Sequence, residues 1–197
     1  MTFRGIKQIN IDALGLSQIY ISREKYASVK KWFHPENMEA FQPVSVYDFG
    51  NGFYTLTDGH TRTLLAYEYG FSAVPAVYDN DDIVTGPIGQ KLYKADIEWC
   101  ARFGLSHIKH LKNRILSKSL YERLWIERCN RSYNLIMGTT GREREKLQGL
   151  NPTLFLYGAS EDMSELYFEN ASGELFVYRE HVLLPEQDTK SCNFESG

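Results

Sequence analysis

The residues best suited to chemistry are Thr57-Asp58-Gly59-His60-Thr61-Arg62, where a β-rich segment ends and a helical pattern begins. The first N–H groups of a helix have no intrahelical acceptor, and the helix dipole places partial positive charge beside them. A phosphate group satisfies both, and Gly59 removes the side chain that would keep an anion away. Arg62 can add a bidentate contact, Thr61 a hydroxyl donor, and His60 a donor or a proton shuttle. The spacing therefore predicts a phosphate site, and we call Asp58–Arg62 the Gly59 box.

A purely structural role explains the same residues. Asp58 is a good helix N-cap, and its carboxylate would then occupy the first N–H groups itself. Arg62 would in that case be a surface partner of Glu68 or Glu39. An aspartate at this position repels phosphate unless a metal ion intervenes, so Asp58 is also the candidate ligand for Mg²⁺. The local pattern leaves a phosphate site and a capped helix both open.

The elements that must position the box follow from hydrophobic spacing and turn residues. The hairpin is indicated by Gly50-Asn51-Gly52 between two β-rich segments, and the first helix by Ser22 as its N-cap. The predicted elements are an edge strand at 9–14, a helix at 23–33, strands at 44–49 and 53–57, a helix from Asp58-Gly59 to Tyr69, and a strand at 74–78. The box therefore lies at a strand-to-helix junction.

Residues 9–78 resemble the ParB/sulfiredoxin superfamily, specifically the ParB N-terminal domain-like fold. The resemblance rests on an ordered series of features: the strand at 9–14, Gln18 before a helix, Gln42-Pro43 before a strand, a glycine-bearing turn, the Gly-x-x-Arg pattern of Gly59 to Arg62, and Val74-Pro75-Ala76-Val77. It implies a nucleotide or phosphate site at the box. The residues expected to bind a nucleoside triphosphate or diphosphate (ATP, ADP or CTP) with Mg²⁺ are Gly59, Thr61, Arg62, Gln42 and Gln18.

The superfamily includes partition proteins that bind cytidine triphosphate and DNA, sulfiredoxins that repair sulfinic cysteine with ATP, and kinases of free serine. His60 stands where sulfiredoxins carry their nucleophilic cysteine, so sulfur chemistry is not implied. Asp58-Gly59-His60-x-Arg62 is most similar to the kinase branch, which implies catalytic roles for Asp58 and His60 and a small hydroxyl substrate. Those kinases place a glutamate before the first helix, where this chain has Ser17 and Gln18.

Charge along the chain supports an alternative function. Residues 91–131 carry a net charge of +6 and residues 150–197 a net charge of −7, in a chain whose net charge is −3. Basic helices over 91–131 are expected of a non-catalytic DNA- or nucleotide-binding module. If the basic and acidic segments pair with each other instead, DNA binding is weak. The sequence therefore leaves nucleotide-dependent phosphotransfer and binding without chemistry as two hypotheses.

The composition is that of a folded protein, and the predicted strands and helices make it an α+β protein. The chain has 197 residues, of which 43% are hydrophobic and 24% charged, and it has neither a membrane-length apolar run nor a signal-peptide pattern at its start. Three widely spaced cysteines fit a reducing cytoplasm, and no membrane partner is expected. The predicted organisation is a ParB/sulfiredoxin-like domain at 1–82, a helical block at 88–150, a β-hairpin element at 151–185 and a mobile tail at 186–197.

Overall fold

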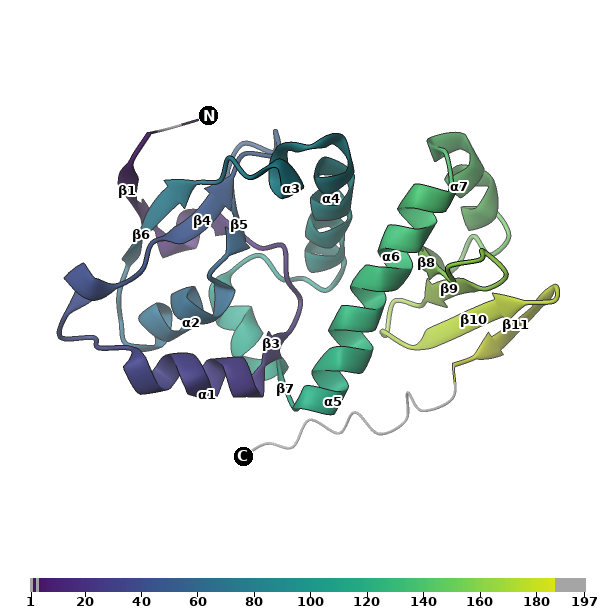
Figure 1. Ribbon diagram of the computed structural model, residues 1–197. Helices are drawn as coiled ribbons and strands as arrows, with labels where there is room; N and C mark the ends of the chain where they lie inside the picture. The colour runs from purple at the N-terminus through teal and green to yellow at the C-terminus, as the bar shows by residue number, and fades with distance from the viewer. Residues whose placement is uncertain (1, 3, 187–197) are drawn as a thin grey trace. The chain divides into compact units, whose positions relative to one another are not determined.

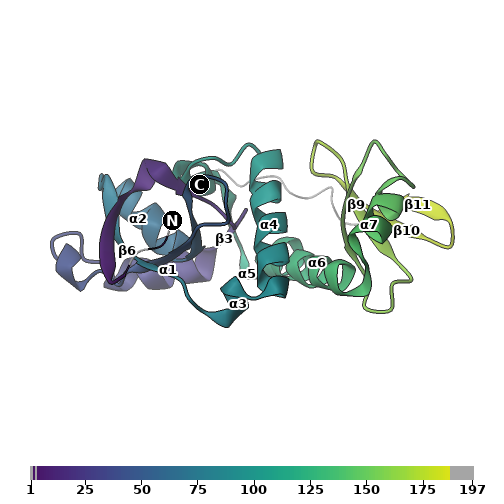
Figure 2. The same cartoon turned by 90° about the horizontal axis from the view of Figure 1, so that it is seen from above.

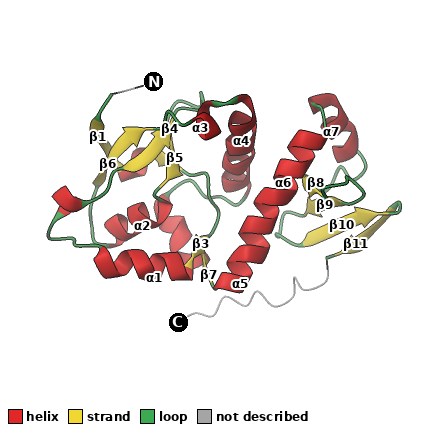
Figure 3. Cartoon of the chain, viewed as in Figure 1, coloured by secondary structure: helices red, strands yellow, loops and turns green. Residues whose placement is uncertain are grey.

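The computed structural model describes residues 2 and 4–186. The fold is α+β, with 44% of the residues in helices and 24% in strands, and Figure 3 shows both kinds of element in each half of the chain. The chain divides into two compact units, Met1–Glu122 and Arg123–Gly197. Within the described part of the chain, no helix combines the length and the apolar character that crossing a membrane requires.

The first unit contains a five-stranded mixed sheet in the order β1-β6-β4-β5-β2 (Figure 1). Its strands are β1 (Ile6–Asn10), β2 (Leu14–Gly15), β4 (Val44–Tyr47), β5 (Tyr54–Asp58) and β6 (Ala73–Tyr78). The antiparallel pairing of β4 with β5 confirms the predicted hairpin, and β6 confirms the predicted third strand.

The prediction of one edge strand over residues 9–14 is wrong. The Asn10 side chain accepts a hydrogen bond from the Asp12 N–H at 2.9 Å, and a 3-10 turn, Ile11–Ala13, separates β1 from β2. β1 pairs with β6 at one edge of the sheet, while β2 pairs with β5 at the other. The short turn therefore carries the chain across the sheet.

Two helices of the first unit frame the Gly59 box, α1 (Arg23–Trp32) and α2 (His60–Glu68). The Ser22 hydroxyl accepts from the Lys25 N–H, which confirms the predicted N-cap of α1. Helix α2 buries Leu64, Leu65 and Ala66 completely and ends before Gly70, as predicted. α1 packs on α2 (Figure 1), and the Tyr26 hydroxyl donates to the Glu68 carboxylate.

Residues 80–122 also belong to the first unit, so the predicted helical block at 88–150 is divided between the two units. The turn-rich segment at 80–89 is a tight corner between helices: Asp81 caps α3, and a Cβ on Gly89 would lie 1.8 Å from the Ile83 carbonyl oxygen. The elements that follow are α3 (Asp82–Thr85), α4 (Pro87–Arg102), a 3-10 helix (Ile108–Arg114), β7 (Ile115–Leu116) and α5 (Lys118–Tyr121), with β3 (Ile21–Ser22) parallel to β7. Among them, the 3-10 helix packs on α2, β7 and α5 pack on β3, and α3 packs on α4.

The sequence indicates two helix starts within the predicted helical block, one capped by Ser106 and one with Ser119 and Glu122 at capping-box spacing, and both predictions are wrong. Ser106 does not cap an α-helix. His107 instead caps a 3-10 helix, its ring nitrogen accepting from the Lys109 N–H at 2.9 Å. Ser119 and Glu122 do not form a capping box, because α5 continues into a π-helical turn, Glu122–Ile126.

The second unit packs helices against a four-stranded antiparallel sheet in the order β11-β10-β9-β8. Its elements are α6 (Glu127–Gly138), α7 (Gly141–Gln148), β8 (Phe155–Ala159), β9 (Leu166–Glu169), β10 (Leu175–Arg179) and β11 (Val182–Pro185). The β9–β10 pairing confirms the second predicted hairpin, whereas β11 was not predicted. Of the predicted mobile tail at 186–197, residues 187–197 lie outside the described residues.

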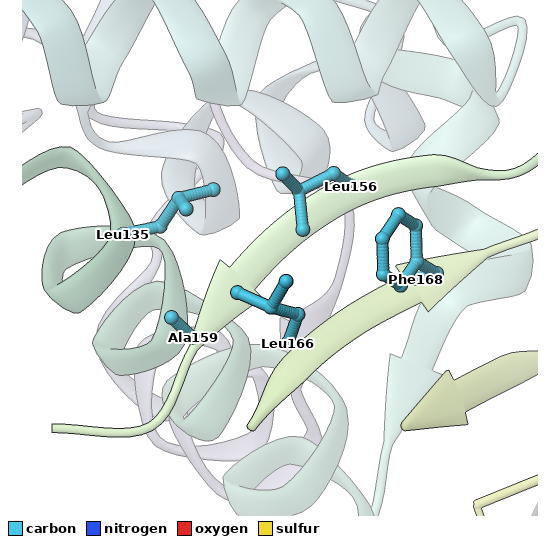
Figure 4. Packing of buried hydrophobic residues seen from close by; sticks show 5 residues of the cluster. All are labelled: Leu135, Leu156, Ala159, Leu166 and Phe168. Carbon is cyan, nitrogen blue, oxygen red and sulfur yellow. The ribbon is translucent and has the colours of Figure 1, made fainter. Parts of the chain in front are cut away.

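The core of the second unit lies between α6 and the sheet. Figure 4 shows its buried cluster of Leu135, Leu156, Ala159, Leu166 and Phe168. Helix α6 packs against β8, and Figure 2 shows α6 beside the sheet that contains β9. The approach of α6 is close at Gly158. A Cβ placed there would lie 2.4 Å from the Arg131 Cβ and 2.8 Å from its carbonyl carbon. The absence of a side chain at Gly158 therefore sets the separation of helix and sheet.

We expect Gly158→Ala to destabilise the protein by about 1–3 kcal/mol, because the added methyl group forces α6 off the sheet. Gly141→Ala is the matched control, since a Cβ at Gly141 meets no atom within 4 Å. Urea unfolding followed by circular dichroism measures both variants. Equal stability of the two variants would contradict this account of the packing.

Candidate phosphate site at the start of helix α2

Gly59 is the N-cap of α2 and holds a backbone conformation that only glycine adopts readily. Its φ is 93°, in the left-handed region. A Cβ at this residue would lie 2.5 Å from Val44 Cγ1 and 2.8 Å from Val44 Cβ. The junction therefore needs glycine for two reasons, the turn itself and the contact with β4.

Asp58 is not the N-cap of α2, so the capped-helix interpretation of that residue is wrong. Asp58 is the last residue of β5, and no side chain caps α2 in the described part of the chain. The N–H groups of the first turn lack intrahelical acceptors in any α-helix. At α2 they are consequently left for another acceptor.

Cationic side chains converge on the Asp58 carboxylate. An Arg62 guanidinium nitrogen lies 2.6 Å from Asp58 Oδ2, and Lys25 Nζ lies 3.9 Å from Oδ1. Arg62 also donates to Gln42 Oε1 at 3.2 Å. The structure therefore joins three predicted site residues, Asp58, Arg62 and Gln42, and adds Lys25, which sequence reasoning missed. Arg62 pairs with neither Glu68 nor Glu39, because its guanidinium turns back toward β5.

The electrostatics of this cluster favour an anion. A helix N-terminus attracts negative charge, yet here it has Arg62 in its first turn and Lys25 close by. Only one carboxylate, Asp58, pairs with both cations among the described ion pairs. The Arg62 side chain is only 13% exposed, which lowers the dielectric screening of its charge. Two cations and a helix dipole thus share one negative charge.

His60 lies in the core rather than facing the cations. Its side chain is buried, and its Nε2 accepts a hydrogen bond from the Ser17 N–H at 3.2 Å. The Ser17 hydroxyl donates to the Leu56 carbonyl oxygen at 2.6 Å, which ties the same segment to β5. Burial lowers the pKa of His60 to about 4, so the ring is neutral at pH 7. This arrangement gives His60 a positioning role and directs its accepting nitrogen away from a ligand.

Of the other predicted binding residues, Thr61 is buried and Gln18 is hydrogen-bonded elsewhere. Thr61 is buried, with 3% of its surface exposed. The Gln18 amide donates to the Tyr20 carbonyl oxygen at 2.5 Å and to the Tyr121 hydroxyl at 3.1 Å. Gln18 therefore anchors the segment before α1 to α5, and the structure does not bring it to the cations of the box.

Asp58 alone does not form a cation site. No cluster of three or more His, Cys, Asp or Glu side chains suited to a metal ion occurs among residues 2 and 4–186. The Asp58 carboxylate is 56% exposed and already pairs with Arg62 and Lys25. The chain would thus hold Mg²⁺ only where a ligand's phosphate oxygens supply further coordination.

Three arginines of the segment 91–131 pair with carboxylates within the fold. Arg128 forms a buried bidentate pair with Glu169, at 2.7 and 3.1 Å. Arg131 pairs with Glu186, the last described residue, at 2.8 and 3.1 Å. Arg102 pairs with Glu98 at 3.0 Å. The expected attraction between the basic and acidic segments therefore occurs inside the second unit.

Comparison with known proteins does not assign the chain to a family. No family model matches this sequence, and no curated protein matches it significantly. The function of the Gly59 box is therefore argued from its geometry and charge.

We expect Gly59→Ala to destabilise the protein by about 2–4 kcal/mol, the sum of left-handed strain and the clash with Val44. Gly70→Ala is the control, because Gly70 has a φ of 84° and a Cβ added there would meet no atom within 4 Å. The control isolates the conformational cost of about 1–2 kcal/mol. Chemical denaturation compares the two, and a Gly59→Ala loss no larger than the control's would disprove the packing constraint.

Stability should also depend on His60 between pH 6.5 and 4. The folded pKa of about 4 lies below the ordinary value of 6.5, so the unfolded chain binds the proton more readily in this range. Folding stability is thus fully present above pH 6.5 and falls on acidification, by on the order of 3 kcal/mol. Urea unfolding at several pH values from 4 to 7 gives the free energy of unfolding as a function of pH. This free energy should change less with pH in His60→Gln than in His34→Gln, which removes an exposed ring and is the control. The same pH dependence of the unfolding free energy in both variants would contradict a buried neutral His60.

Proposed function

We propose that the first unit is a phosphate-binding domain of the ParB/sulfiredoxin kind, which binds the phosphates of a nucleotide at the Gly59 box. The observation that carries this proposal is the uncapped start of α2, where Arg62 and Lys25 share a single carboxylate. A phosphate would accept from the first N–H groups of the helix and from the guanidinium. Gln42 holds Arg62 in place for that contact.

The geometry supports binding rather than phosphotransfer. A general base must reach the hydroxyl that attacks the phosphate. His60 is neutral, but it is buried and already accepts from Ser17. Asp58 is accessible, but it is the counter-ion of Arg62 and Lys25. In this proposal His60 positions the β5–α2 junction. Asp58 pairs with Arg62 and Lys25 until a phosphate replaces its carboxylate.

The ligand class that fits is a nucleoside diphosphate or triphosphate, with Mg²⁺ held mainly by the phosphates. The alternative of DNA binding through residues 91–131 has less support, because Arg128 and Arg131 of that segment pair with carboxylates of the acidic segment. Duplex DNA should bind no tighter than the ~10⁻⁴ to 10⁻⁶ M of non-specific complexes at physiological salt.

Two substitutions with opposite expected effects test the proposal. Arg62→Ala should weaken nucleotide binding about 10- to 100-fold, as expected for loss of a charged hydrogen bond worth ~1.5–3 kcal/mol. Asp58→Asn should strengthen it about fivefold, because it removes a competing charge worth ~1 kcal/mol at 4 Å in water. Isothermal titration with ATP, ADP and CTP, with and without Mg²⁺, measures both effects.

The pair Glu98–Arg102 on α4 provides a matched control, since it has the same spacing of four residues and lies apart from the box. Glu98→Gln and Arg102→Ala should leave nucleotide affinity unchanged. Loss of binding in Asp58→Asn, together with phosphate transfer by the wild-type protein to serine or another small hydroxyl compound, would replace the binding proposal with the kinase-like one. Absence of nucleotide binding by the wild-type protein would contradict both the binding proposal and the kinase-like alternative.

A further inference from the structure

The two cations of the Gly59 box come from different helices and contact opposite oxygens of one carboxylate. Arg62, on α2, has a guanidinium nitrogen 2.6 Å from Asp58 Oδ2, and Lys25, on α1, has its Nζ 3.9 Å from Asp58 Oδ1. Among the described ion pairs, neither cation has a second carboxylate. An anion that replaces Asp58 must therefore offer a separate oxygen to each cation.

The same cluster contains a third source of donors, the first N–H groups of α2. A Cβ added to Gly59, the N-cap of this helix, would lie 3.2 Å from an Arg62 guanidinium nitrogen, so the guanidinium lies directly beside the helix start. These N–H groups lack intrahelical acceptors, and no side chain caps them in the described part of the chain. The box thus presents donors from three sources, which are a guanidinium, an ammonium and the backbone.

Phosphate groups differ in the number of oxygens that they can offer to these donors. A terminal phosphate has three free oxygens and a charge of about −1.5 to −2 at pH 7. An internal phosphate, which is esterified on both sides as in a DNA strand, has two free oxygens and a single charge. The terminal group can give each source of donors an oxygen of its own and matches the charge of the two cations. An internal group leaves one source without its own oxygen.

We propose that the Gly59 box selects a terminal phosphate over an internal phosphodiester, and that Lys25 is the residue that sets this selectivity. The inference rests on the proposed function, because it assumes that a phosphate replaces the Asp58 carboxylate. The Arg62 side chain is only 13% exposed and has Gln42 as a second partner, so it is held in place for either kind of phosphate. Lys25 is 60% exposed and pairs with Asp58 alone among the described ion pairs, so its ammonium can move to the additional oxygen.

Two ligands that differ only at the end of the phosphate chain test the selectivity. ATP has a terminal γ-phosphate, and the γ-methyl ester of ATP has one charge and one free oxygen fewer at that phosphate. Isothermal titration of the full chain without Mg²⁺ should show ATP binding about tenfold more tightly than the ester, as expected for one further charge that faces two cations at the surface.

The pH dependence of the two affinities provides a second readout. Between pH 7.5 and 5.5 the terminal phosphate takes up a proton, because its second pKa is about 6. ATP binding should therefore weaken about threefold over this range relative to binding of the ester. The ester, measured at the same pH values, cancels any titration of the protein groups around the box, including His60, Asp58 and Lys25.

Substitutions on α1 test the role of Lys25. Lys25→Ala should weaken ATP binding about fivefold and change binding of the ester less than about twofold, so that the preference for ATP shrinks. Lys25→Arg should retain the preference, because it keeps the charge. Arg62→Ala should weaken the binding of both ligands. Lys31→Ala removes another exposed lysine of α1 and is the matched control, which should change neither affinity.

The outcomes separate the selectivity from the site itself. If ATP and its ester bind equally well and both depend on Arg62, the selectivity is wrong and the phosphate site remains. If ATP is preferred but Lys25→Ala keeps the full preference, the assignment to Lys25 is overturned. If neither ligand binds, this inference and the proposed function both fail.

Discussion

The first unit depends on one close contact, the packing of Gly59 against Val44 at the β5–α2 junction. The left-handed turn allows β5 to end directly above the first turn of α2, and the missing side chain lets β4 lie against it. Because the helix starts immediately after the turn, its N–H groups and Arg62 lie beside the end of the strand. A larger residue would separate the strand from the helix and disperse the charges that meet there.

The charges at this junction are arranged against the usual preference of a helix. Anionic side chains stabilise helix N-termini, and cationic ones oppose the dipole. Here Arg62 and Lys25 lie beside the N-terminus of α2, and among the described ion pairs only Asp58 balances them, so a bound anion would relieve this arrangement. His60 contributes no charge, because burial keeps it neutral and its hydrogen bond to Ser17 fixes the segment before α1.

The second unit uses its charges in the opposite way. Arg128 pairs with Glu169 and Arg131 with Glu186, and each also lies over a tyrosine ring, Tyr157 at 4.5 Å and Tyr167 at 3.8 Å. Removing one partner of a buried pair leaves an uncompensated charge, which is strongly destabilising. These arginines therefore hold α6 to the sheet, and two charges of the basic segment are used inside the second unit.

The sequence by itself determined the local features of this protein. Gly50-Asn51-Gly52 predicts the β4–β5 hairpin, Ser22 predicts the start of α1, and Gly59 predicts the strand-to-helix junction, because each depends on residues close in the chain. Only the tertiary structure decided the rest: Lys25 meets Asp58, Gln42 meets Arg62, and His60 accepts from Ser17. These partners are 20 to 43 residues apart. Side-chain type does not reveal which distant partner it will meet, because that depends on how the sheet and its helices pack.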